Sequence, residues 1–256
     1  MARHIEAVMD GVQLSTVGPI IIQQVQEPAA DMEITYGARP GRSGQDVLSV
    51  RRKALKVTIQ TAIRELFDLG RRADVLQAMA GWARGSVLEL SNHPGQVLNV
   101  ICRSLPALGD VRSYTQLINI ELEASEIPYW QEKAPVTASG SGASGSMQLY
   151  VPGTAEEIPV ELTFTPGGTL TSLVVTVSCG GVSRSISLGG MSLSGAVKFQ
   201  REAGDRLGIV SGSTRLLQYR SAESADDLLI PAGAATISWV ANVSGTMAVS
   251  VRGRWL

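Results

Sequence analysis

The chain has 256 residues, 44% of them hydrophobic but only 5% aromatic, with 27 glycines and a formal net charge of -1. This length fits one large or two ordinary domains, and a charge near zero excludes the attraction on which nonspecific binding to nucleic acid or anionic membranes depends. Two cysteines, Cys102 and Cys179, and two histidines, His4 and His93, are too few for a Cys-based zinc site or a disulfide-stapled scaffold, and predict two free thiols.

The first half of the chain combines strand and helix patterns. Strands are predicted over residues 20–25, 32–36, 56–63 and 115–124, where short apolar or alternating stretches occur. Apolar side chains recur at helical spacing over residues 74–83 and predict a single helix. Residues 86–102 predict a hairpin, and its turn of Asn, His, Pro and Gly would leave His93 in solvent.

The clearest boundary is a run of nine small residues, Ala138 to Ser146, made of Gly, Ser and Ala. Such side chains bury too little surface to offset the entropy lost on ordering, so the run predicts a flexible linker. The expected organisation is a first domain over residues 1–133, a linker over 134–146 and a second domain over 147–256.

Beyond this run the sequence predicts strands throughout. They are expected over residues 158–164, 170–177, 182–188, 193–199, 235–239 and 246–251. Gly pairs between them supply the positive φ angles that tight hairpin turns need. This spacing predicts an antiparallel β-sandwich or jelly roll with Phe199 and Trp239 in its core, so the expected fold class is mainly β with one α-helix.

No pattern typical of catalysis is present. Gly-rich segments never continue into Gly-Lys-Ser/Thr, and the Gly-x-Ser-x-Gly elbow of hydrolases does not occur. Acidic residues occur in pairs in turns or on strand faces, where solvated surface charge is favoured over a catalytic dyad. These pairs are Glu121/Glu123, Glu156/Glu157, Glu202/Asp205 and Asp226/Asp227. We therefore expect no enzyme activity, no metal and no cofactor.

The N-terminal residues do not form the apolar core of a secretory signal, because Glu6 and Asp10 interrupt them. Apolar runs in the chain are also far shorter than the roughly 18 residues that span a bilayer. We therefore expect that the protein does not insert into a membrane and that it is synthesised in the cytoplasm.

The one local excess of charge is basic. It comprises Arg39, Arg42, Arg51, Arg52, Lys53 and Lys56. Three interpretations are open: a solvated loop and strand edge that discourages unwanted pairing, a protein interface that uses bidentate Arg contacts, or a nucleic-acid site. They are favoured in that order, because a nucleic-acid site would need aromatic stacking partners and Tyr36 alone is a weak one.

The order of the segments resembles that of a known family. The resemblance is carried by the helix pattern of residues 71–82, the turn at 90–95, the motif Ile127-Pro128-Tyr129-Trp130, the turn at 229–233 and the terminal residues 251–255. Over nearly its whole length the chain resembles the distal tail protein (Dit) family of long-tailed, non-contractile phages and prophages.

The resemblance implies a tail-tube-like first domain and a galectin-like or jelly-roll-like second domain. It implies a structural virion protein at the tail tip: a homo-oligomeric, hexameric ring that joins the tail tube protein to the tail hub, or tail-associated, protein. The lumen of the ring would pass the tape-measure protein and then DNA. The second domain would project outward and hold baseplate or receptor-binding proteins.

The resemblance also suggests where the ring contacts lie, because in the tail-tube fold a long hairpin lines the lumen and an extended loop reaches a neighbour. The hairpin is expected from strands around residues 47–50 and 56–66, and the loop at 37–45. The expected ring interface uses Arg39, Arg42, Arg51 and Arg52. Trp130 is expected to pack over the base of the first domain.

The alternative function is a carbohydrate-binding, lectin-like host-recognition module that acts through the second domain. Sugar sites present an exposed aromatic side chain with polar neighbours, and Tyr219 with Arg220 is the candidate contact. A six-fold ring in solution would favour the connector, whereas a stable monomer that binds a glycan would favour the lectin.

Overall fold

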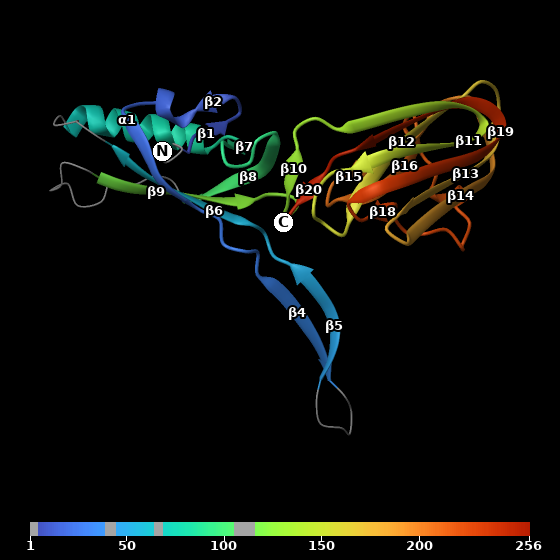
Figure 1. The fold of residues 1–256 in the computed structure, drawn as a ribbon, viewed down its shortest axis with the longest axis horizontal. Coiled ribbons are helices and arrows are strands. Elements are labelled where there is room, and N and C mark those ends of the chain that lie inside the picture. The colour runs from blue at the N-terminus through green and yellow to red at the C-terminus, as the bar shows by residue number, and fades with distance from the viewer. Residues whose placement is uncertain (1–4, 39–44, 64–68, 105–115) are drawn as a thin grey trace. The chain divides into compact units, whose positions relative to one another are not determined.

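The computed structural model describes residues 5–38, 45–63, 69–104 and 116–256 (Figure 1). The chain forms two compact units, Met1–Trp130 and Gln131–Leu256, each of which is described by itself. Strands dominate both units, and the fold class is mainly β, as predicted. None of the helices in the described ranges is long and apolar enough to cross a membrane.

The first unit is built on an antiparallel sheet with strand order β2-β1-β7-β8-β9-β6-β3. Its strands are β1 (Ala7–Met9), β2 (Val12–Gln13), β3 (Ile20–Gln26), β6 (Lys56–Ile63), β7 (Val87–Leu90), β8 (Gln96–Ser104) and β9 (Gln116–Ala124). In the central pair, Ile59 of β6 lies opposite Ile120 of β9, and both are fully buried. The alternation predicted for these two strands therefore places one face of the sheet in the core.

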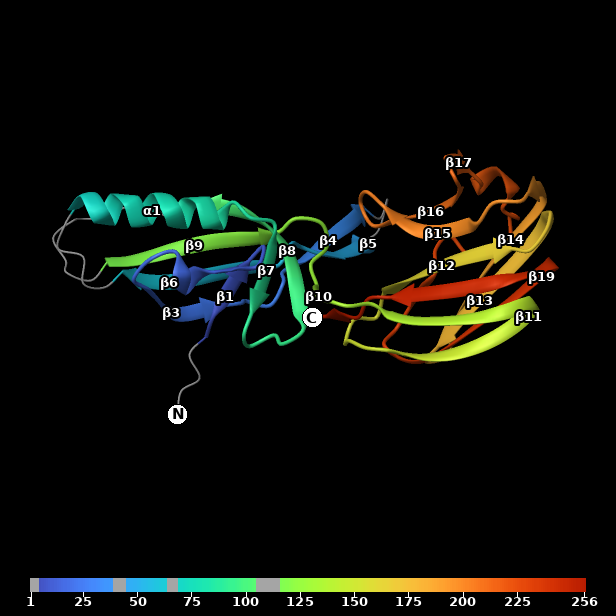
Figure 2. The same cartoon turned by 90° about the horizontal axis from the view of Figure 1, so that it is seen from above.

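One α-helix, α1 (Leu69–Ala83), runs along one side of this sheet (Figures 1 and 2). It begins before the predicted residue 74 and ends where predicted. Leu76, Met79 and Trp82, at helical spacing, are all buried. The indole Nε1 of Trp82 donates a hydrogen bond to the Val12 carbonyl at 2.7 Å, which fixes the helix against the short strands at the sheet edge.

The remaining strands of the first unit form a separate hairpin, β4 (Met32–Ala38) with β5 (Gln45–Arg52). Within the described residues neither strand pairs with any other, and Figure 1 shows the hairpin extending away from the sheet. The expected hairpin of residues 47–50 with 56–66 is wrong: β5 pairs with β4, whereas β6 pairs with β3 and β9. Residues 64–66 of that expectation lie outside the described residues.

The second unit contains strands almost throughout. They are β11 (Val136–Val151), β12 (Ile158–Pro166), β13 (Leu170–Cys179), β14 (Val182–Leu193), β15 (Val197–Glu202), β16 (Arg206–Ser211), β17 (Thr214–Arg215), β18 (Leu229–Ile230), β19 (Gly233–Val251) and β20 (Arg254–Trp255), with a short 3-10 helix η2 (Leu217–Tyr219). The short strand β10 (Trp130–Glu132) contains the boundary between the units.

The long strand β19 organises the second unit. Its first part, up to Ala241, pairs with β13, and its last part, from Gly245, pairs with β12. Side chains of both partners, such as Phe164 and Val175, are fully buried, and this unit has no α-helix to cover them. The two parts of the sheet must therefore cover each other, which makes the unit a β-sandwich. Phe199 and Trp239 lie in its core, as predicted.

The linker predicted over residues 134–146 is wrong, because most of it belongs to β11. That strand pairs with β19 over its whole length, from Val136 opposite Val251 to Val151 opposite Gly233, with one irregularity between Gly142 and Ser144. The glycines of this segment make room for an aromatic ring: the indole of Trp239 packs where side chains at positions 140 and 145 would otherwise lie. Backbone pairing and this packing order a segment whose composition is typical of loops.

Candidate interaction surface

The β4–β5 hairpin carries different side chains on its two faces. In its register Ile34 lies opposite Val50, and Tyr36 lies opposite Val47. Paired residues share a face, so these four side chains, with Met32 at the base, form one apolar face. The exposed fractions of these five side chains range from 43% to 57%.

The opposite face of the hairpin is polar. Glu33 lies opposite Arg51, and Thr35 lies opposite Ser49. A register irregularity next to Thr35 adds Leu48 as an extra residue, and its side chain is 67% exposed. The hairpin is therefore amphipathic, yet nothing within the described chain covers its apolar face.

Such an arrangement is typical of a surface that binds another protein. A two-stranded hairpin alone is marginally stable in water. Full burial of one large apolar side chain contributes roughly 1.5–3 kcal/mol, so a partner that covers this apolar face would stabilise the hairpin strongly. A contiguous exposed apolar patch with a polar rim is the usual mark of an interaction site.

Of the four arginines expected at the ring interface, the structure describes two, Arg51 and Arg52. Arg51 is exposed on the polar face of the hairpin, opposite Glu33. Arg52 ends β5, and its guanidinium carbon lies 5.7 Å from the centre of the Tyr129 ring, a cation–π arrangement. Residues 39–44 of the expected loop, with Arg39 and Arg42, lie outside the described residues. Its other members are strand residues: Gly37 and Ala38 end β4, and Gln45 begins β5.

A polar cluster lies at the base of the hairpin and centres on Glu27, just after β3. The Glu27 carboxylate accepts hydrogen bonds from Asn92 Nδ2 at 2.9 Å, His93 Nε2 at 2.8 Å and Trp130 Nε1 at 3.1 Å. The rings of His93 and Trp130 are stacked, with centroids 4.2 Å apart and an interplanar angle of 11°. Trp130 is only 1% exposed, in keeping with the packing role expected for it.

His93 is thus not the solvated turn residue that the sequence predicts. Its side chain is 26% exposed, and it is engaged on one edge by Glu27 and on one face by Trp130. Both partners are far away in the sequence, so no local pattern could reveal them. The Pro-Tyr-Trp motif was the only available signal that this region is constrained.

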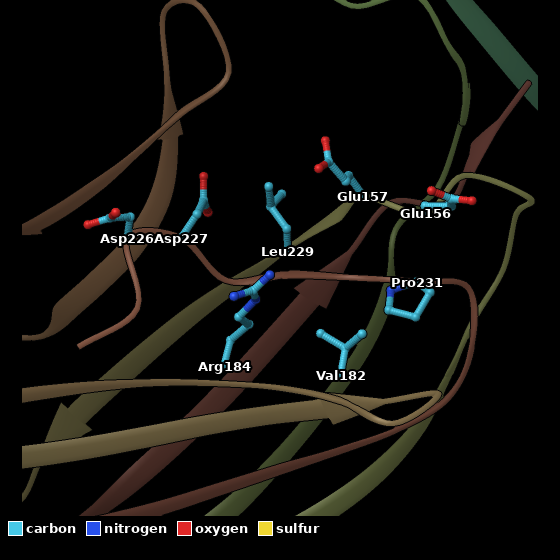
Figure 3. Close-up of a pocket in the computed structure, with 8 residues that line it drawn as sticks. All are labelled: Glu156, Glu157, Val182, Arg184, Asp226, Asp227, Leu229 and Pro231. Atoms are coloured by element: carbon cyan, nitrogen blue, oxygen red, sulfur yellow. The ribbon is translucent and has the colours of Figure 1, made fainter. Parts of the chain in front are cut away.

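The second unit has a cavity of about 490 Å³ on its surface (Figure 3). It is lined by the carboxylates of Glu156, Glu157, Asp226 and Asp227, by Arg184, and by the apolar side chains of Val182, Leu229 and Pro231. Asp227 accepts two hydrogen bonds from the Arg201 guanidinium, and Asp226 pairs with Arg220 at 3.0 Å. Two of the four carboxylates therefore already have cationic partners.

Tyr219 and Arg220, the candidate sugar contact, are less available than expected. Tyr219 is half-buried at the end of η2, and the Arg220 guanidinium is held by Asp226 and the Ala225 carbonyl. Tyr150 in β11, by contrast, is 67% exposed. A contact role for Tyr219 and Arg220 remains a prediction.

Several acidic residues expected to be solvated are instead in ion pairs. Arg254 is 5% exposed, and both of its terminal nitrogens donate to Asp205, at 2.9 and 2.8 Å. Glu202 pairs with Arg215 at 2.9 Å. Over the described ranges, no group of three or more His, Cys, Asp or Glu side chains is arranged to hold a metal ion.

The two cysteines are free, as predicted, and differ in exposure. Cys179 is buried in the sandwich, and Cys102 is half-buried in β8. Burial raises the pKa of the Cys179 thiol. Burial also raises the pKa of Cys102, against the smaller opposing effects of a hydrogen bond with the Ser104 backbone and of the charge of Arg84.

Comparison with known proteins identifies the fold. Neither a protein-family model nor a curated protein sequence matches the chain. The chain is similar to the crystal structure of SPP1 Dit (gp 19.1), described as a paradigm of the hub adsorption apparatus in phages that infect Gram-positive bacteria. The TM-score is 0.64 at 12% sequence identity, over 98% of this chain and 99% of that chain.

A second similar structure is the phage P2 baseplate in its activated conformation with Ca, with a TM-score of 0.44 and 10% identity over 99% of this chain and 98% of that chain. The likeness to SPP1 Dit shows that the chain has the Dit fold, as the sequence resemblance implied. At this level of identity the likeness concerns the fold.

Proposed function

We propose that the chain is a structural protein of a phage tail tip. Copies of it form a ring, with six-fold symmetry expected, that joins the tail tube to the tail hub or baseplate and lets DNA pass. Two observations support this proposal: the Dit fold and the exposed apolar face of the β4–β5 hairpin.

The hairpin is the observation that carries the proposal. A contact in which the hairpin of one copy covers a different surface of the next copy is heterologous. Such head-to-tail contacts generate a closed ring when the rotation between copies closes, so one amphipathic hairpin in each subunit provides the contact that a ring needs. Arg51 lies on the exposed polar face, and its contact with a neighbouring copy is part of the proposal.

The passage of DNA requires a surface that does not bind phosphate. The face of the first sheet opposite its core carries Gln24, Gln60 and Asn119 in one cross-strand row, and Gln26, Thr58 and Glu121 in the next. Amide and carboxylate groups offer no cation to the DNA backbone. Two cations lie nearby, and both are beside Glu123: Lys56 lies opposite it in the register, and Arg103 is paired with it at 2.8 Å. This face is therefore the candidate wall of the lumen.

The remaining partners follow from the same proposal. The tail tube protein would contact one side of the ring and the tail hub protein the other, and the tape-measure protein would occupy the lumen before DNA. The second unit would hold baseplate or receptor-binding proteins. The protein would be made in the host cytoplasm and act at the tail tip of the virion.

The test compares two double variants of the full chain. Ile34→Glu with Val50→Glu places charge on the apolar face, and Thr35→Glu with Ser49→Glu places the same charge on the polar face. We expect rings by electron microscopy and a six-fold mass by light scattering for the wild type and the polar-face variant, with or without added tail tube protein. The apolar-face variant should be monomeric. A monomeric wild type under both conditions, or rings from the apolar-face variant, would overturn the proposal.

A second candidate function is the carbohydrate-binding module, and the cavity of the second unit is the observation that favours it. Glu157 and Arg184 offer hydrogen-bonding groups beside the apolar Leu229 and Pro231 (Figure 3). The lining contains no aromatic ring on which a sugar could stack, which is why this candidate ranks second. A glycan array with the full chain tests it: binding that Arg184→Ala abolishes would support it, and no bound glycan would exclude it.

A further inference from the structure

Two adjacent residues, Tyr129 and Trp130, contact the chain on either side of the β4–β5 hairpin: one at the end of β3 and one at the end of β5. Before β4, the Glu27 carboxylate accepts a hydrogen bond from Trp130 Nε1 at 3.1 Å. At the end of β5, the Arg52 guanidinium lies over the ring of Tyr129. The point where the chain leaves the sheet toward the hairpin and the point where it returns are thus held by the same pair of residues.

The Glu27 contact is part of a hydrogen-bonded cluster. The side chain of Glu27 is 18% exposed, and its carboxylate has donors from Asn92, His93 and Trp130. The stacked ring of His93 keeps the indole of Trp130 from rotating, because the two rings lie nearly parallel at 4.2 Å. Charge-assisted hydrogen bonds are the stronger ones, and partial burial reduces their screening by water.

These contacts lie where the chain passes between the sheet and the hairpin. Within the described residues β4 and β5 pair only with each other. The Lys53 N–H donates to the Asp31 carbonyl at 2.8 Å, which joins the two strands at the base of the hairpin. Trp130 is also the last residue of the first unit, so the chain passes from this contact directly into the second unit.

We propose that Tyr129 and Trp130 are positioning residues that form a latch at the base of the hairpin. With both contacts made, the hairpin keeps one direction relative to the sheet and presents its apolar face to the next subunit. With the contacts broken, the hairpin moves about its two ends, and its cross-strand hydrogen bonds open more often because a two-stranded hairpin alone is marginally stable. This inference rests on the proposed function, because a fixed direction matters for assembly only if the hairpin contacts a neighbour.

Hydrogen–deuterium exchange of the full chain tests the latch at a concentration where it is monomeric. Trp130→Phe keeps the stack on His93 and removes the N–H donor, and Arg52→Gln removes the cation at the other end. In each variant we expect amides of residues 32–38 and 45–52 to exchange roughly tenfold faster, about the effect of losing one charge-assisted hydrogen bond. Amides of β6 and β9 should be unchanged.

The matched control is Trp82→Phe, which also removes one indole hydrogen bond from the first unit, but at the far edge of the sheet. It should leave exchange in the hairpin at the wild-type rate. Unchanged hairpin exchange in both latch variants would overturn the inference, as would faster exchange throughout β6 and β9, which would make Trp130 a core residue only. Because exchange is measured on monomers, this outcome is independent of whether wild-type rings form.

Discussion

The indole ring of Trp239 lies over the backbone of Gly145, in the space where a β-carbon at that position would be. The two residues are direct partners in the β11–β19 register, and Trp239 Nε1 donates to the Gly142 carbonyl at 3.3 Å. A large ring opposite a glycine covers the exposed backbone of its partner strand, an arrangement that stabilises glycine within sheets. Trp239 is only 3% exposed as a result.

Gly145→Ala is therefore expected to destabilise the second unit. The added methyl group has to displace the indole ring, and overpacking of this kind costs about 1–3 kcal/mol. Urea unfolding monitored by circular dichroism measures the decrease in the free energy of unfolding. Gly189→Ala in β14 is the matched control, because a β-carbon there meets nothing within 4 Å. Equal losses in the two variants would contradict the packing role of Gly145.

Asp205→Asn is expected to destabilise the second unit by about 3 kcal/mol, because it removes the charge to which the buried Arg254 guanidinium donates twice. Asparagine tolerates the positive φ of 58° at this position, so backbone strain does not confuse the result. Glu202→Gln breaks an exposed pair, in which Arg215 is 70% exposed, and should cost less than about 1 kcal/mol. Chemical denaturation of both variants gives the comparison.

Asp10→Ala is expected to destabilise the first unit by about 2–3 kcal/mol, because it removes a charged acceptor and places alanine at a positive φ of 49°. The Asp10 carboxylate accepts hydrogen bonds from the Ser86 N–H at 2.9 Å and the Val87 N–H at 3.0 Å, and so joins the β1–β2 turn to the start of β7. Loss of such a charged acceptor leaves backbone donors without their partner. Ser15→Ala, at an exposed position nearby, should change the unfolding free energy by less than about 0.5 kcal/mol.

Stability is expected to fall as the pH rises above 9. In the folded state the pKa of both thiols is raised from the ordinary value of 9.0, chiefly by burial. The folded chain then holds these protons more tightly than the unfolded chain. The contribution of the protonated thiols to the free energy of unfolding is therefore fully present below pH 9 and is lost as the pH rises through the raised pKa values. Denaturant unfolding curves between pH 7 and pH 10.5 measure how the free energy of unfolding changes with pH. If a Cys102→Ala, Cys179→Ala double variant shows the same change, the thiols are not the cause of the loss of stability.

Much of the fold could be predicted because its signals are local. Alternation in β6 and β9 marks the face that each strand buries, and the apolar spacing before Gly85 marks α1. The Gly- and Ser-rich part of β11 could not be predicted, because the reason for its glycines is Trp239, which lies far along the chain. The composition of a segment determines how much side-chain surface the segment itself can bury, but it does not indicate which distant side chains pack against it.

The candidate site was predicted only in part for a similar reason. The basic residues near the hairpin could be predicted as a candidate interface because a local excess of charge can be read directly from the sequence. The apolar face of Ile34 and Val50 looks like an ordinary half-buried strand until the structure shows that the described chain covers neither side. Glu27 and His93 belong to one cluster only because β3 ends beside the β7–β8 turn, a relation that tertiary structure alone establishes.

The pairing of β11 with β19 also determines when the second unit can fold during protein synthesis. Val136 has its partner in Val251, so β11 leaves the ribosome long before the strand that pairs with it exists. An unpaired strand in this period is a template for association with other chains, and segments rich in apolar and β-branched residues are the most hazardous. The Gly- and Ser-rich part of β11 lacks the apolar and β-branched residues that favour such association, which suits a strand that waits for its partner.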